Sequence, residues 1–399
     1  MWEKVIDINQ VTEIRAKTTV YFGVGAINKI ADISDVLVLR GIKKVIVVTG
    51  KGSHIITGAW NTVRKVFDQK DIEYILYSEI TPNPTVDQVD EATRIAVDFG
   101  AAAVIAIGGG SPIDAAKSVA VLMAYPGRDA RELYEYKFAP EKAVPVVAVN
   151  LTHGTGTEVD RFAVVSIPEK EYKPAIAYDC IYPLYSIDDP ALMTMLPEKQ
   201  TAYVSIDAIN HVTEASTTKV TNPFAILLAK EAVRLVAKYL PAAQKDPGDL
   251  TARYYLLYAS LIAGIAFDNG MLHLTHALEH PLSGVKQELP HGLGLAILLP
   301  AVIKQIYPAT AEILAEVLSP IVEGLKGTKD EALKASEGVK AWLKDMMVNS
   351  SLKDIGFTPE DMDKLTELAF NTPSLGLLLS LAPVEATKEV VRQIYSDSL

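Results

Sequence analysis

Apolar residues follow two different patterns along the chain, and the change between them lies near residue 190. Before that point, short apolar runs that are typical of buried strands alternate with segments of helical period, of which 86–99 is the clearest. The strand candidates are 45–48, 74–76, 102–107 and 144–149, with an edge or pairing strand at 19–22. Strands and helices that alternate at this spacing predict a parallel sheet with helices on its faces.

After Asp188-Asp189-Pro190 the pattern is helical almost throughout. Segments 224–239 and 251–267 are apolar on much of their circumference, as expected for helices buried in a bundle. We therefore expect two domains, an α/β domain at 1–190 and an all-helical domain at 191–399. Helix breaks are expected at Asn222-Pro223, Pro241, Pro247-Gly248, Pro281, Pro290, Pro359 and Pro373.

Charge and cysteine content narrow the classes of partner. The net charge of −11 and the pI near 5.2 argue against binding to nucleic acid or to an anionic membrane surface. The longest apolar runs, 293–303 and 375–381, are shorter than the roughly 18 residues of a membrane span. Cys180 is the single cysteine and the N-terminus lacks the apolar core of a secretory signal, so we expect a cytoplasmic protein. The free edge of the first strand suggests a homodimer.

Five of the seven histidines lie between residues 207 and 291. Asp207 and His211 are four residues apart, as are His276 and His280, so each pair would share one helix face. His291 follows a proline where a loop meets a helix. Imidazole nitrogen with one carboxylate suits Fe(II), Zn(II), Ni(II) or Co(II) better than Mg or Ca. One such pair alone would be read as a solvated or hydrogen-bonded helix face, but together they predict a metal site.

A glycine-rich segment, GGGSPIDAAK at 108–117, follows the strand candidate 102–107 directly. Uncovered backbone N–H groups at the start of a helix can bind an anion such as a pyrophosphate. Alternatively, Ser111 as N-cap, Pro112 at the first helical position and Asp114 at the third would form a helix start without any ligand. That alternative leaves three successive glycines unexplained.

A second glycine-rich turn, THGTGTE at 152–158, also follows a strand candidate. It lies at a strand's carboxyl end, where open α/β sheets place ligands, although a tight turn would explain it equally well. His153 and His54 are expected in loops without a role.

The segments GGGSPIDAAK, GTGTE, LPEKQTAYVSIDAINH and the run from HLTHALEHPL to LPHGLGLAILLP resemble the iron-containing, or group III, alcohol dehydrogenases. The resemblance covers most of the chain. It implies a Rossmann-like dinucleotide-binding domain at 1–190, a helical metal-binding and catalytic domain of the dehydroquinate-synthase-like kind at 191–399, and a cleft between them.

The resemblance also implies roles for individual residues. The metal ligands would be Asp207, His211, His276 and His291. His280 would lie near the nicotinamide as a proton relay, and Asp114 would lie on the same side as a second catalytic candidate. The candidate cofactor contacts are Gly50, Asn83, Gly109, Gly110, Ser111, Asp114, Thr152, Thr155, Lys173 and Leu192.

The chain departs from the family's pattern at two informative positions. His273 replaces a usual glycine, which makes it an extra histidine close to the site and suggests a place in the substrate pocket. Gly50 lies where NAD-specific relatives carry an aspartate that binds the ribose hydroxyls and repels a 2′-phosphate. Its absence favours NADP(H) over NAD(H), unless Gly50 serves only the turn and either cofactor is used.

The predicted activity is therefore that of an NAD(P)-dependent alcohol dehydrogenase or aldehyde reductase with bound Fe(II), or with Zn, Ni or Co in its place. The metal would polarise the oxygen of a small alcohol or aldehyde while the nicotinamide exchanges hydride. Alternatives are a glycerol-dehydrogenase-like polyol dehydrogenase, a lyase of the dehydroquinate-synthase kind and a non-catalytic nucleotide-binding protein. Retention of all four metal-ligand positions argues against the last.

Overall fold

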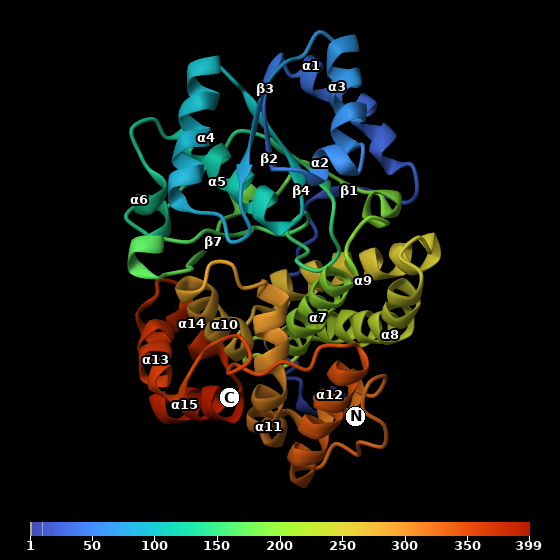
Figure 1. Ribbon diagram of the computed structural model, residues 1–399, viewed down its shortest axis with the longest axis vertical. Coiled ribbons are helices and arrows are strands. Elements are labelled where there is room, and N and C mark those ends of the chain that lie inside the picture. Colours follow the sequence, from blue (N-terminus) through green and yellow to red (C-terminus); the bar gives the residue numbers. More distant parts are fainter. Residues whose placement is uncertain (1, 10) are drawn as a thin grey trace.

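The computed structural model describes residues 2–9 and 11–399 and has two lobes, a sheet with its helices above and a bundle of helices below (Figure 1). The sheet has six strands in the order β1-β8-β5-β4-β2-β3, and every neighbouring pair is parallel. The strands are β1 (Thr19–Phe22), β2 (Lys44–Gly50), β3 (Glu73–Ile80), β4 (Ala103–Gly108), β5 (Val146–Asn150) and β8 (Tyr185–Asp188), and β6 (Phe162–Val164) and β7 (Ala175–Ala177) form a separate antiparallel pair.

Helices cover both faces of the sheet and make it a double-sided core. Alternate residues of β4 point to opposite faces, because Val104 and Ala106 belong to one apolar cluster and Ile105 and Ile107 to the other. The helices of this lobe are α1 (Ile30–Leu39), α2 (Ser53–Ile56), α3 (Ala59–Gln69), α4 (Val86–Phe99), α5 (Gly110–Ala124) and α6 (Ala130–Tyr134). Residues of α1 and α3 join one cluster and residues of α4 and α5 join the other.

The lower lobe is helical and shares one large apolar core. Its helices are α7 (Glu198–Ala215), α8 (Pro223–Lys245), α9 (Leu250–Gly270), α10 (Leu274–Val285), α11 (His291–Val317), α12 (Ala332–Asp345), α13 (Met362–Asn371), α14 (Leu375–Leu381) and α15 (Lys388–Asp397). Short 3₁₀ helices are η1 (Trp2–Val5), η2 (Ala26–Lys29), η3 (Pro168–Lys170), η4 (Asp179–Ile181), η5 (Pro190–Met193), η6 (Lys329–Glu331) and η7 (Pro359–Asp361). The prediction of a parallel α/β domain followed by a helical domain is confirmed.

The strand candidates 45–48, 74–76, 102–107 and 144–149 are all confirmed as strands, with ends that differ by a few residues. The edge strand 19–22 and the helix 86–99 have the predicted bounds. The strands β6, β7 and β8 were not predicted, because runs of three or four residues are too short to show a period.

Two of the expected helix breaks are wrong. Pro241 lies inside α8 and Pro281 inside α10, although a proline in a helix removes one backbone hydrogen bond at a cost of about 3 kcal/mol. Both helices pack into the large apolar core, and burial of their other residues outweighs that loss. The longest helix, α11, contains two prolines of its own and is kinked at Thr310.

Two helices, α9 and α11, are long and apolar enough to cross a membrane by length and composition. In the described part of the chain, 61% and 72% of their apolar windows are buried inside the structure. Core helices commonly have this property, so the two helices are weak evidence for a membrane span.

The second glycine-rich turn joins the two lobes. A Cβ at Gly154 would lie 2.5 Å from the Val204 carbonyl oxygen of α7, and one at Gly156 would overlap Gly264 of α9. Gly156 also has a φ of 65°, which favours glycine. The glycines of this turn therefore let the α/β lobe approach the helical lobe closely, beside the metal-ligand candidates on α7.

Candidate metal centre and cofactor cleft

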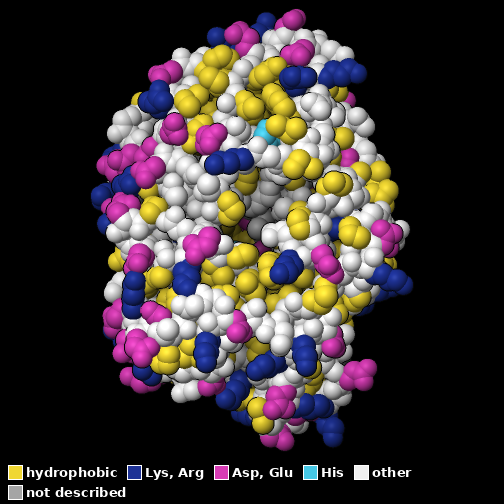
Figure 2. Space-filling view, viewed as in Figure 1, with side chains coloured by type: hydrophobic (Ala, Val, Ile, Leu, Met, Phe, Trp, Pro, Cys, Tyr) yellow, Lys and Arg dark blue, Asp and Glu magenta, His cyan; other side chains and the backbone are white. Residues whose placement is uncertain are grey.

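A cavity of about 190 Å³ lies where the two lobes meet, and Figure 2 shows the surface hollowed there with hydrophobic side chains along its lower rim. The two groups of residues that the sequence singled out line this same cavity. From the α/β lobe these are Asn83, Gly110, Ser111, Asp114, Thr155 and Lys173, and from the helical lobe Asp207, His211, His276, His280 and His291. Gly50, Gly109, Thr152 and Leu192 do not line it.

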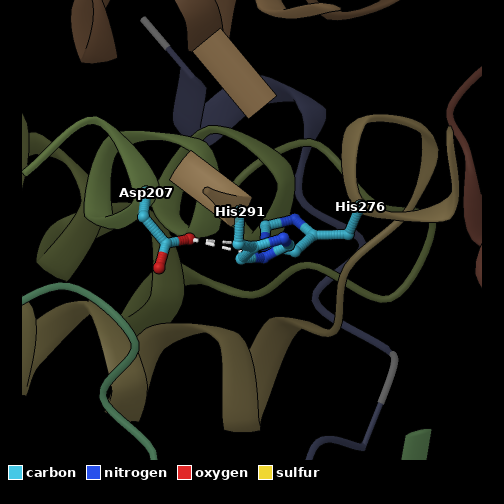
Figure 3. Close-up of side chains that lie close together, drawn as sticks. All are labelled: Asp207, His276 and His291. Carbon is cyan, nitrogen blue, oxygen red and sulfur yellow. Dashed lines mark ion pairs between the residues drawn. The ribbon is translucent and has the colours of Figure 1, made fainter. Parts of the chain in front are cut away.

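Three of the predicted metal ligands face Oδ1 of the fourth, Asp207, and the ligand atoms of Asp207, His276 and His291 all lie within 4.8 Å of one another. Oδ1 of Asp207 lies 3.5 Å from Nε2 of His211, 3.6 Å from Nε2 of His276 and 4.0 Å from Nε2 of His291. Asp207 and His211 come from α7, His276 from α10 and His291 from the first position of α11. Figure 3 shows the imidazole rings of His276 and His291 beside the Asp207 carboxylate, and the two rings are tilted by 57° with 5.4 Å between their centroids. His211 stacks on His276 with 4.6 Å between ring centroids.

Each imidazole of this cluster is held through its Nδ1 atom, which leaves Nε2 free for a ligand bond. His211 donates from Nδ1 to the Gly154 carbonyl at 3.2 Å. His276 and His291 donate from Nδ1 to the buried carboxylates of Glu214 and Glu279. Partners of this kind fix the tautomer and orientation of a metal-binding histidine.

Two buried atoms of the cluster have no hydrogen-bond partner, Oδ1 of Asp207 and Nε2 of His276. Burial opposes ionisation of Asp207, but the neighbouring imidazoles outweigh it and lower its pKa to about 2. Burial also opposes a charge on His276, yet Glu214 and Asp207 raise its pKa to about 9. A divalent cation would satisfy both orphaned atoms in place of that proton, so these residues fit a transition-metal ion.

Glu214 and Glu279 are site residues that the sequence analysis missed. Both are fully buried, and Glu214 also accepts hydrogen bonds from the backbone N–H groups of Thr275 and His276 at 2.5 and 3.3 Å. Glu214 lies three residues after His211 on α7, a spacing that could have drawn attention to it. A helical glutamate is usually solvated, however, and only the fold reveals that this one is not.

Charge in the site favours a divalent cation. Burial opposes ionisation of Glu214 and Glu279, but neighbouring histidines, with Lys173 at Glu279, lower the pKa of both carboxyls, as at Asp207. The Lys173 ammonium pairs with Glu279 at 3.3 Å. Once a metal replaces the proton of His276 and every imidazole is neutral, three carboxylates and one ammonium leave two negative charges, which a divalent cation would balance.

His280 lies in the cavity wall in a different role from the other histidines. It donates from Nδ1 to the Lys173 carbonyl at 2.8 Å, so Nε2 carries a lone pair. Burial, followed by the Lys173 ammonium, holds the pKa of His280 well below its usual value. It also lies near Glu279 and His291 in a second possible metal-binding group, but Glu279 is already bonded to Lys173, His291 and Ser283.

Helix α5 starts in the first glycine-rich segment, and its N-terminus has no side-chain cap. Helix α5 begins at Gly110 with Gly109 as N-cap and no side-chain cap, so the assignment of Ser111, Pro112 and Asp114 to a capping arrangement is wrong. Asp114 instead accepts hydrogen bonds from Oγ1 of Thr157 at 2.6 Å and from the Val164 N–H at 2.9 Å, because its side chain faces the neighbouring loop.

The glycines of this segment are needed for close packing. A Cβ at Gly109 would lie 2.5 Å from Oγ1 of Thr152, and one at Gly110 would lie 2.7 Å from Cγ2 of Thr155. The two glycine-rich loops therefore lie against each other, and the N–H groups at the start of α5 stay uncovered. This arrangement fits the pyrophosphate of a dinucleotide.

The remaining cofactor candidates are spread around this region. Asn83 lines the cavity and donates to the carbonyls of Gln287 and Leu289 at 2.8 and 3.2 Å, which ties the two lobes together. Leu192 is buried in the core of the α/β lobe. Gly50 ends β2, where a Cβ would lie 3.2 Å from the Ile80 carbonyl oxygen.

The structure corrects the expected places of His273 and His54 and confirms that His153 lies in a loop. His273 does not line the cavity; it is the fully buried N-cap of α10, bonded to Oγ1 of Thr217 at 2.9 Å and to the Leu274 N–H at 2.6 Å. His54 lies in the short helix α2 and is buried. His153 lies in the glycine-rich turn but is buried too, and donates to Oγ of Ser205 at 3.0 Å.

Backbone strain gathers at the cavity. Seven of the described non-glycine residues have a positive φ, and four of them, Asn83, Tyr136, Met271 and Ser374, line the cavity. Such conformations cost of order 1–3 kcal/mol each and persist where the surroundings enforce them, typically at functional sites. The surrounding structure therefore holds the cavity in its shape despite the conformational free energy that these four residues cost.

Apolar side chains form the wall beside the metal cluster. They come from both lobes and include Phe162, Val164, Ile176, Phe267, Leu272, Leu377 and Leu378. A ligand with a hydrocarbon portion would fit such a wall, and the buried polar groups would orient its reactive end.

Comparisons with known proteins agree with this geometry. Residues 17–190 match the family described as iron-containing alcohol dehydrogenase, and residues 201–399 match the C-terminal region of that family. The chain is 61% identical over 398 residues, 100% of both chains, to the long-chain primary alcohol dehydrogenase AdhA of Thermoanaerobacter ethanolicus. It is 29% identical to the NADPH-dependent butanol dehydrogenase of Clostridium saccharobutylicum, over 94% of this chain and 95% of that one. The crystal structure of the NADH-dependent butanol dehydrogenase A of Thermotoga maritima superposes with a TM-score of 0.87 at 29% identity, covering 98% of each chain.

The metal-ligand assignment predicts the behaviour of His276→Ala. Loss of its Nε2 removes one of the two orphaned atoms, so the variant should lose both the bound ion and the activity. Elemental analysis of purified protein gives the metal stoichiometry. His54→Ala, which changes a buried histidine outside the cluster, is the control and should keep its metal. Retention of stoichiometric metal by His276→Ala would reject the assignment.

The buried partners of the ligands predict a second, graded effect. Glu214→Gln keeps the shape of the side chain but removes the charge that orients His276, so affinity for Co²⁺ or Zn²⁺ should fall by roughly 10- to 100-fold. Competition with a chelator measures this directly. Glu231→Gln on α8, where Glu231 pairs with Arg234, is the matched control and should bind as the wild type does. Equal affinity in both variants would show that Glu214 does not support the site.

Proposed function

This chain belongs to the iron-containing alcohol dehydrogenase family, and we propose that it oxidises primary alcohols, including long-chain ones, and reduces the corresponding aldehydes with NADP(H) preferred over NAD(H). One observation carries the proposal. The histidine cluster and the uncovered start of α5 open into a single cavity that has an apolar wall. The name of the relative at 61% identity agrees with a long hydrocarbon substrate.

Different residues of the cavity would bind the metal, bind the cofactor and orient the substrate. When bound, a divalent ion, for which we propose Fe(II) with Zn, Ni or Co as alternatives, supplies Lewis-acid chemistry at the alcohol oxygen, and the nicotinamide accepts hydride. Asp207 and its three imidazole neighbours would hold the ion. The N–H groups of Gly110 and Ser111 would hold the pyrophosphate. The buried apolar wall would exclude water and orient the reacting carbon.

The experiment that tests this function is a substrate panel. Protein loaded separately with Fe, Zn, Ni or Co is assayed with primary alcohols of increasing length, with NAD and with NADP. We expect activity that rises with chain length and is lost on chelation. No oxidation of any primary alcohol by any metal-loaded form would reject the proposal.

A polyol dehydrogenase is the second candidate, and one observation favours it. Asp160 is fully buried and lines the cavity, and its Oδ2 has no hydrogen-bond partner. It could accept a hydrogen bond from a second hydroxyl group, although the apolar wall around Phe162 and Phe267 offers such a substrate little else. Higher kcat/KM for 1,3-propanediol or glycerol than for 1-hexanol in the same panel would favour this candidate.

His280 is the residue that we propose to pass the alcohol's proton to solvent. It lines the cavity four residues after His276, it is not one of the four proposed ligands, and its Nε2 carries a lone pair. A neutral imidazole in this position can accept a proton and release it. Asp114 also lines the cavity, but both of its carboxylate oxygens already accept hydrogen bonds, which fits a positioning role better than proton transfer.

The relay predicts that His280→Ala keeps its metal while turnover drops by about 10²-fold and the pH dependence of kcat changes. Metal content and the pH profile are both measured, with His276→Ala as the comparison that should lose the ion. A His280→Ala protein without metal would make His280 a ligand instead of a relay.

Cofactor preference is a separate proposal, because relatives with NADPH-dependent and NADH-dependent names both align over nearly the whole chain. Gly50 at the end of β2 carries no carboxylate that would repel a 2′-phosphate, and the neighbouring Lys51 is exposed and offers a cation. The alternative is structural. Gly50 lies at a shift in the pairing of β2 with β3, which could by itself require a small residue.

Substitution at Gly50 separates the two explanations. Gly50→Asp should shift the ratio of kcat/KM for NAD over NADP toward NAD by more than tenfold, or about 1.4 kcal/mol of transition-state binding. Gly50→Ala adds the same Cβ without the charge and should leave the ratio unchanged. A wild type that already prefers NAD, or equal shifts in both variants, would contradict the proposal.

We also propose a homodimer in the cytoplasm. Within the described residues, β1 is an edge strand that pairs only with β8. The segment before it carries exposed apolar side chains, with Ile8 at 90% and Val11 at 97% exposure. A second copy of the chain could cover both features. A single-subunit mass in light scattering would reject the dimer.

A further inference from the structure

Met271 has the backbone conformation of a glycine. It is the C-cap of α9, with φ 66° and ψ 171°, a backbone region that residues other than glycine almost never adopt. Its N–H donates to the Phe267 carbonyl at 2.7 Å.

The residues before and after Met271 are clamped. Upstream, Asn269 exchanges two hydrogen bonds with the backbone of Arg15, at 2.6 and 2.9 Å, and a Cβ at Gly270 would overlap the Ala215 carbonyl. Downstream, His273 is fixed by Thr217 and by the start of α10. With only three residues between α9 and α10, the turn is confined to one conformation, and Met271 takes the strain.

Met271 lines the cavity, as do the apolar residues Phe267 and Leu272. His276, one of the proposed metal ligands, follows five positions later and lines the same cavity. A glycine at 271 would relieve the strain at no steric cost, but it would leave the wall open at this point. We therefore infer that the strained backbone at position 271 is retained because a methionine there supplies a side chain to the cavity wall.

We propose that Met271 is a specificity-determining residue, whose side chain narrows the apolar part of the cavity and selects linear over branched primary alcohols. This inference rests on the proposed alcohol dehydrogenase function. A thioether chain is flexible and fills irregular gaps, so it can lie along an extended hydrocarbon chain and still exclude a bulky branch. Adding or removing one methylene-sized group in an apolar pocket commonly changes the ratio of kcat/KM between two substrates by tenfold or more.

Two substitutions at this position separate shape from strain. Met271→Ala and Met271→Gly both remove Cγ, Sδ and Cε, but only glycine relieves the backbone. We expect the ratio of kcat/KM for 3,3-dimethyl-1-butanol over 1-butanol to rise by about tenfold or more in both variants of the metal-loaded, full-length protein. We expect the Tm of Met271→Gly to exceed that of Met271→Ala by at least about 2 °C, the reverse of the usual order of glycine and alanine.

Met347 provides the matched control. It is a second methionine with positive φ, at 61°, but it is 61% exposed and does not line the cavity. Met347→Gly and Met347→Ala should show the same order of Tm and leave the ratio of branched to linear alcohol at its wild-type value.

The outcomes distinguish this inference from the proposed function. A wild type that oxidises primary alcohols, together with an unchanged substrate ratio in both Met271 variants, would overturn the role of Met271 and leave the function intact. A wild type without alcohol oxidation would reject the function itself. A Met271→Gly protein less stable than Met271→Ala would show that the backbone is not strained as the dihedral angles indicate.

Discussion

A buried carboxylate that needs a cation is the constraint on which the rest of the structure depends. Asp207 is 2% exposed, and its Oδ1 faces three imidazole rings without any hydrogen bond. Burying such a group is costly unless a cation compensates for it. The fold supplies the conditions for that cation, since Glu214 and Glu279 turn the rings of His276 and His291 so that each Nε2 faces the carboxylate.

Convergence of three helices on one point requires them to approach closely, and small residues make this possible. A Cβ at Gly292, next to His291, would overlap the Tyr203 carbonyl of α7, and one at Gly294 would lie 2.8 Å from the Glu279 side chain. The same principle joins the lobes, where the glycines of the second turn approach α7 and α9. Glycines that look like nucleotide-binding signals in the sequence thus also serve as packing residues, and the two roles coincide because the cofactor cleft lies where the lobes meet.

Residues with a strained backbone conformation contribute to the shape of the cavity wall. Four strained residues line the cavity, whereas Glu171, Asp71 and Met347 are the remaining cases in the described chain. Strain is tolerated there because the flanking residues are bonded into helices or to the opposite lobe, as Asn83 is to the loop before α11. A less constrained chain would relax, and the wall would lose its shape.

The sequence by itself determined the features that depend on local periodicity or on the identity of single residues. Alternating apolar runs indicated the parallel sheet, and the four-residue spacings of Asp207 with His211 and of His276 with His280 indicated the helices that carry the proposed ligands, because helix and strand periods are properties of neighbouring residues. Only the tertiary structure decided which of these residues meet. In the folded protein Glu214 accepts a hydrogen bond from His276, His273 lies outside the cavity and is bonded to Thr217, and Met271 has a backbone conformation typical of glycine. Each of these depends on burial and on contacts between segments far apart in the chain, where the packing of whole helices outweighs local preference.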